Sequence, residues 1–238
     1  MPRSSQPQPN RSQSSASPSS PSAPSLPASP RSDAAARRAD VPWWAVVSAV
    51  TAPVAMIGGW TLAQAQQESF DPVRATISDL ATQASSAPWI MGAGLAITGV
   101  AHLVTAAGLR PVPRTARILH AIGGAATLAV AVFPSDVAPG AHFAAAGIGF
   151  GALALWPAWA RRRGATGVLR PVVATTASVV LVALLVAFLL ELWQVTSDGG
   201  ATGLTERLVA GAQALWPLVV TLALVRSARR ARIRAVEV

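Results

Sequence analysis

The sequence contains no cysteine, no lysine and no tyrosine, and only 10 of its 238 residues are acidic. Without cysteine the chain forms neither disulfides nor thiolate metal sites. Charged residues make up 12% of the chain, about half of what a soluble domain usually carries. Because 52% of the residues are also hydrophobic, the composition disfavours a soluble globular protein and is typical of a chain that crosses a membrane.

The basic residues, apart from three histidines, are all arginine, and the net charge is +9. Nucleic-acid binding would require arginines on one folded basic face, with aromatic side chains as stacking platforms. Here the arginines lie in clusters between apolar runs, which is how membrane proteins distribute them. We therefore predict no nucleic-acid partner.

Two kinds of segment divide the chain. Residues 1–40 are mostly Ser, Pro, Ala, Gln and Arg, and such a segment buries too little apolar surface to offset its ordering entropy, so we predict a disordered cytosolic tail. Apolar runs close to the roughly 20 residues of a membrane-spanning helix follow at 43–65, 88–109, 116–133, 142–160, 172–195 and 205–225. The sequence thus predicts an all-α, polytopic six-helix transmembrane bundle over residues 41–227, and a basic cytosolic tail at 228–238.

The arginines also predict the orientation of the bundle. If the N-terminus lies inside, every arginine except Arg74 and Arg207 falls on the inner side of the six spans. Most of the acidic residues fall at the outer side. Short loops of membrane proteins keep arginine on the cytosolic side, so we predict an N-in, C-in protein of the plasma membrane.

A repeat is visible in the second half of the chain. The tetrad LRPV occurs at 109–112 and 169–172, and the triad LWP at 155–157 and 215–217, each pair 60 positions apart. Similarity at a fixed period is the usual signature of a repeat. The third and fourth spans and the fifth and sixth spans are therefore predicted to be two copies of one helical hairpin. The pair Gly147 and Gly151 in the fourth span is a G-x-x-x-G pattern and predicts close helix packing.

The predicted outer connections share the dipeptide Ser-Asp, at 78–79, 135–136 and 197–198. Thr76 and Asp79 have the spacing of a helix capping box. Glu191 lies inside an apolar run, where a carboxylate is costly unless it is paired or faces water, and its expected partners are Arg207 and His142. We predict an outer polar cluster made of Ser78, Asp79, Asp136, His142, Glu191, Glu206 and Arg207.

This cluster leaves three functions open. The first is a pocket in the outer leaflet that binds a membrane lipid headgroup or a small polar ligand. The second is a small proton- or cation-coupled transporter, which would need polar residues through both halves of the bundle. The third is a membrane-embedded hydrolase, which would need Ser78 or another nucleophile within hydrogen-bond reach of His142. The three histidines lack the spacing of a metal site, so we predict neither a metal nor a cofactor.

Four motifs together carry a resemblance to a known family. These are ISDL at 77–80, FPSD at 133–136, HFAAAGIGF at 142–150 and GLTERL at 203–208. In combination they resemble the six-span bacterial membrane proteins called domain of unknown function 998, over most of residues 43–226. The Ile-Ser-Asp element is also similar to the Frag1/DRAM/Sfk1 membrane proteins, some of which are linked to lipid handling. The resemblance implies six helices and an outer polar rim, and it brings no established reaction and no catalytic residues.

Overall fold

The computed structural model describes residues 40–194 and 200–236, and these residues form six long helices and no strand. The helices are α2 (Trp43–Gln64), α3 (Pro88–Gly108), α4 (Arg114–Val132), α5 (Pro139–Ala160), α6 (Pro171–Gln194) and α7 (Thr202–Val236). All six are long and apolar enough to cross a membrane. The predicted all-α bundle with six spans is therefore confirmed, while the tail predicted for residues 1–40 lies almost entirely outside the described residues.

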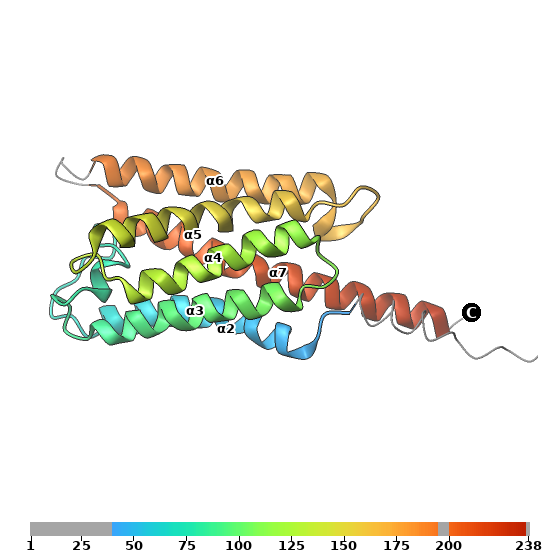
Figure 1. Ribbon diagram of the computed structural model, residues 1–238, viewed down its shortest axis with the longest axis horizontal. Helices are drawn as coiled ribbons and strands as arrows, with labels where there is room; N and C mark the ends of the chain where they lie inside the picture. Colours follow the sequence, from blue (N-terminus) through green and yellow to red (C-terminus); the bar gives the residue numbers. More distant parts are fainter. Residues whose placement is uncertain (1–39, 195–199, 237–238) are drawn as a thin grey trace, which may run out of the picture.

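The helices are arranged as an up-and-down bundle along the long axis of the molecule (Figure 1). Consecutive helices from α2 to α6 pack against each other, and α7 packs against both α2 and α6, which closes the row into a ring. The proposed duplication of the α4–α5 and α6–α7 hairpins stays a prediction.

The two ends of the bundle differ in charge. The connections 65–87 and 133–138 lie at one end, together with the beginning of α7, and the connections 109–113 and 161–170 lie at the other (Figure 1). We name the first the acidic end, after Glu68, Asp71, Asp79, Asp136, Glu191 and Glu206. We name the second the arginine end, after Arg110, Arg114, Arg117, Arg161, Arg162, Arg163 and Arg170.

Each end has its own buried apolar cluster. The cluster at the acidic end consists of Met56, Ala63, Ile77, Leu80, Met91, Leu95, Ala210 and Ala214. The cluster at the arginine end consists of Leu109, Val112, Ala116, Leu153, Trp156, Ala160, Leu169 and Val220. Lipid tails are as apolar as these side chains, so the gain from burying them is close packing rather than escape from water.

Glycine allows two helices to touch at one crossing. A Cβ atom added to Gly99 of α3 would lie 2.7 Å from the carbonyl oxygen of Gly124 in α4, and one added to Gly124 would lie 2.8 Å from the oxygen of Gly99. The packing role predicted for Gly147 and Gly151 is wrong, because a Cβ atom at either position would meet nothing within 4 Å. Small residues therefore bring α3 and α4 together, but they leave α5 open where Gly147 lies.

Helix α7 is longer than the others, with 35 residues, and its last turns project beyond the bundle (Figure 1). It stays helical through residues 228–236, which the sequence assigned to a basic tail. Near its end, Arg232 forms an ion pair with Asp40, just before α2.

Candidate functional site

A short turn at the acidic end holds the first site residues in place. The backbone N–H of Thr76 donates to the Asp79 carboxylate at 2.7 Å, and the N–H of Asp79 donates to the Thr76 hydroxyl at 3.0 Å. These are the reciprocal bonds of a capping box, here at the start of the 3₁₀ turn η1 (Asp79–Ala81). The turn places Ser78 between its two capping residues and directs it toward the bundle.

Ser78 meets two further polar side chains from distant helices. Its Oγ lies 3.1 Å from His142 Nε2 of α5, and it lies 3.3 Å from Glu206 Oε1 of α7, to which it can donate. The other Glu206 oxygen accepts a hydrogen bond from the N–H of Ile77. His142 is 2% exposed and Glu206 5%. The three side chains thus form a cluster that joins a loop, α5 and α7.

His142 makes a second hydrogen bond through its other ring nitrogen. Nδ1 lies 2.9 Å from the carbonyl oxygen of Phe133, the residue that ends α4. With both nitrogens engaged, the orientation of the ring is fixed.

This cluster opens into a groove of about 520 Å³ at the acidic end of the bundle, between α5, α6 and the first turns of α7. Its polar lining consists of Arg74, Thr76, Ser78, Asp79, Ser135, His142, Thr202 and Glu206. Its apolar lining consists of Phe143, Ala146, Gly147, Phe150, Leu185, Phe188, Leu189 and Leu192. The groove is therefore amphipathic, with a polar rim and an apolar wall.

A smaller cavity of about 50 Å³ lies deeper in the bundle and shares Ser78, Ala146, Phe150 and Glu206 with the groove. It is also lined by His102 and Gln213. The Gln213 side chain donates to a backbone carbonyl, while its Oε1 is buried without a partner among the described residues. A cavity of this size and polarity is large enough for a few water molecules.

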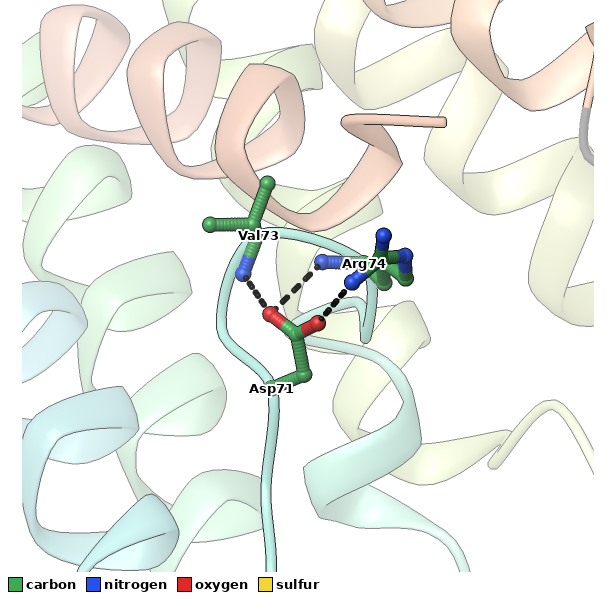
Figure 2. A network of polar contacts seen from close by, with 3 residues as sticks. All are labelled: Asp71, Val73 and Arg74. Carbon is green, nitrogen blue, oxygen red and sulfur yellow. Dashed lines mark hydrogen bonds and ion pairs between the residues drawn. The ribbon is translucent and has the colours of Figure 1, made fainter. Parts of the chain in front are cut away.

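The loop that carries Arg74 is fastened by an exposed carboxylate. Asp71 accepts hydrogen bonds from the N–H of Val73 at 2.9 Å and from Arg74 Nη1 at 2.6 Å. Figure 2 shows how the three residues lie. These hydrogen bonds stabilise the ionised carboxylate and so hold the pKa of Asp71 below its ordinary value. The bond from the Arg74 guanidinium has the largest effect.

The same loop pairs with the first turn of α7. The N–H groups of Gly203 and Leu204 donate to the carbonyls of Arg74 and Val73 at 3.2 and 3.0 Å. One face of the groove is thus tied to α7 through the backbone.

Four of the seven predicted site residues, Ser78, Asp79, His142 and Glu206, line the groove. The other three make structural contacts beside it. Asp136 accepts from the N–H of Gln83 at 2.8 Å and so links two loops, and Glu191 accepts from the N–H of Ala201 at 2.6 Å, just before α7.

The expected pairing of Glu191 with Arg207 and His142 is wrong. Arg207 instead donates to the carbonyls of Pro72, Ala75 and Gly203, because it lies on the side of α7 that faces the 71–76 loop. Of the three Ser-Asp pairs, 197–198 lies outside the described residues.

Four polar groove residues and the whole apolar wall were absent from the predicted site; the four are Arg74, Thr76, Ser135 and Thr202. The position of Arg74 could have indicated a role, since it is one of only two arginines predicted on the outer side of the membrane. The wall carried no such signal, because a phenylalanine or leucine facing a groove looks the same in sequence as one facing lipid. Within the described ranges, no group of three or more His, Asp or Glu side chains is placed to hold a metal ion.

Six apolar helices around an amphipathic groove define a polytopic membrane protein with a polar site at one end. A family model described as protein of unknown function (DUF998) matches residues 49–223. The match covers more than half of the chain, which therefore belongs to this family. Comparisons with curated proteins and with solved structures gave no match.

Proposed function

We propose that this membrane protein binds a single lipid molecule in the groove, with the headgroup at the polar rim and an acyl chain along the apolar wall. The observation that carries the proposal is the amphipathic lining of one continuous space of about 520 Å³. A small polar ligand would contact the rim but not the apolar wall, and a hydrocarbon would contact the wall but offer no polar partner to the rim.

The rim has the charges that a zwitterionic headgroup requires. Arg74 is the one arginine that lines the groove, and only one nitrogen of its guanidinium group, Nη1, bonds to Asp71 within the described residues. Its remaining N–H groups can donate to a phosphate. Asp79, on the same rim, offers a carboxylate to a headgroup amine.

The wall is open toward the acyl region of the bilayer. Phe143 is 58% exposed, and Leu189 of α6 is 50% exposed. A lipid can therefore enter from the side without crossing the bundle, and its chain would replace bilayer lipid against α6.

The transporter alternative needs a polar route through both halves of the bundle, and the packing of the arginine end argues against one. The polar lining of the deeper cavity ends at His102, whose Nδ1 lies 3.0 Å from His120 Nε2. The His120 ring stacks on Trp156 at 4.8 Å, and the apolar cluster of the arginine end lies beyond. This arrangement favours a binding site with one opening.

The orientation that fits this proposal is N-in and C-in in a bacterial plasma membrane, with the groove in the outer leaflet. Its support is the arginine distribution. Reporter fusions after residue 163 should report a cytosolic location, and a periplasmic or exterior signal there would overturn the orientation.

Native mass spectrometry of the purified protein tests lipid binding directly, using Gly147→Phe and Gly151→Phe. Both glycines are on α5 with nothing within 4 Å of an added Cβ atom, but only Gly147 lines the groove. We expect wild type and Gly151→Phe to retain one lipid and Gly147→Phe to lose it. Equal lipid occupancy in all three proteins, or none in wild type, would refute the proposal.

A further inference from the structure

We infer that Ser78 and His142 form a nucleophile and its general base, and that the protein cleaves a carboxylic ester of the acyl chain bound in the groove. The inference rests on the proposed lipid site and adds a reaction, ester hydrolysis, to it. Ser78 lines the groove, and its partner His142 is followed in sequence by Phe143 of the apolar wall. An ester linkage between the headgroup and the acyl chain of a bound lipid can therefore reach it.

The hydrogen bonds of His142 determine which ring nitrogen can act as a base. The Phe133 carbonyl oxygen can only accept, so Nδ1 at 2.9 Å must carry the hydrogen. In the neutral ring Nε2 then has a free lone pair, and this lone pair faces the Ser78 hydroxyl at 3.1 Å. A backbone carbonyl thus holds the ring in the tautomer that a base requires.

Glu206 acts as a positioning residue for the nucleophile. Its carboxylate accepts a hydrogen bond from the N–H of Ile77, next to Ser78, so it ties the loop that carries Ser78 to α7. Ser78 has a single hydroxyl hydrogen, and in the reactive arrangement this hydrogen points to His142 Nε2 at 3.1 Å rather than to Glu206 Oε1 at 3.3 Å. Ser78 is only partly buried and lines the groove, which leaves its oxygen accessible to a bound ester.

The reaction balances with water as the co-reactant. Ser78 Oγ attacks the ester carbonyl carbon while His142 Nε2 takes the hydroxyl proton. The bond from the carbonyl carbon to the alcohol oxygen breaks, and the alcohol leaves with the proton from His142. Water then attacks the acyl-serine, gives a proton to His142, and releases the fatty acid, while Ser78 regains its proton.

An alkyl fluorophosphonate is the probe for this site, because it forms a bond to an activated serine oxygen with loss of fluoride. We expect one adduct per full-length protein, mapped by peptide mass spectrometry to Ser78. Ser135 is an internal control, since it lines the same groove but has no histidine at hydrogen-bond distance within the described residues. The variant His142→Gln should slow labelling at least about 100-fold, the lower end of general-base contributions.

A second measurement separates this inference from the lipid proposal. Wild-type protein should hydrolyse 4-nitrophenyl octanoate in detergent, and Ser78→Ala should lose this turnover. Native mass spectrometry of the wild-type protein reports separately on lipid binding. Wild-type protein that retains lipid but neither labels at Ser78 nor turns over the ester would overturn the inference and leave the binding site standing. Labelling of Ser135 at the same rate as Ser78 would also overturn it.

Discussion

The acidic end and the arginine end each bury histidine, but they use it differently. At the arginine end, His102 and His120 bond to each other and His120 stacks on Trp156, which is fully buried. At the acidic end, His142 is equally buried, yet its Nε2 faces a serine that lines an open groove. Histidine thus packs against aromatic side chains in the core at the arginine end, whereas at the acidic end it contacts a residue that lines the groove.

This difference assigns separate tasks to the two ends. The arginine end is closed by apolar packing, so changes there should reduce stability first. The acidic end is held by hydrogen bonds between loops and helix ends around a space of about 520 Å³, so changes there should alter binding before they alter folding. Three predictions test this division, in order of expected effect.

The largest effect is expected for Trp156→Ala at the arginine end. The side chain is 0% exposed and stacks on His120, so its removal leaves a cavity that costs about 3–5 kcal/mol. The matched control is Trp89→Ala at the acidic end, where the side chain is 73% exposed. Thermal unfolding in detergent should show a large loss for the first variant and little change for the second, and similar losses would break the comparison.

An intermediate effect is expected for Gly203→Ala, where the loop of the acidic end meets α7. An added Cβ atom would lie 2.0 Å from the carbonyl oxygen of Ala75, so the loop must move, at a cost of about 1–3 kcal/mol. Gly140→Ala is the control, because its Cβ atom would meet nothing within 4 Å. We expect Gly203→Ala to lose bound lipid as well as stability, since the loop forms part of the rim. A variant with wild-type lipid occupancy and a wild-type melting temperature would contradict this.

The smallest effect is expected for Asp71→Asn. The pKa of Asp71 is lowered in the folded protein by its bond to Arg74, so its ionised form contributes stability above the unfolded-state pKa. This contribution is lost as the pH falls toward the lowered folded value. Melting temperatures at pH 6 and pH 3 should therefore show a small advantage of wild type over Asp71→Asn at pH 6 that shrinks at pH 3. An advantage that grows in acid would have the wrong sign.

The fold was accessible from the sequence because a membrane span is a local property. Length and apolar composition identified all six helices, with ends that differ by a few residues, as at 205 against Thr202 for α7. The polar site was only partly accessible, because hydrogen bonds between loops depend on which side of a helix a residue faces. In the sequence, Ser78 is 64 positions from His142 and 128 positions from Glu206. The three residues come together because the helices close into a ring.

Glu191 shows why local reasoning fails at a helix end. Its position in an apolar run suggested an intramembrane charge, but its carboxylate binds the N–H of Ala201. Glu206 is the acid that α7 carries into the bundle, where it is 5% exposed. The sequence predicted it only as one member of the outer polar cluster.

The length of α7 has a consequence for whatever lies beyond the bilayer. A helix of 35 residues is about 52 Å long at 1.5 Å per residue, whereas the hydrocarbon layer is about 30 Å thick. The part of α7 beyond that layer is a preformed helix rather than a flexible segment, and it carries Arg226, Arg229, Arg230, Arg232 and Arg234. Its guanidinium groups therefore lie at fixed angular intervals around the helix axis, and no entropic penalty for folding this segment remains.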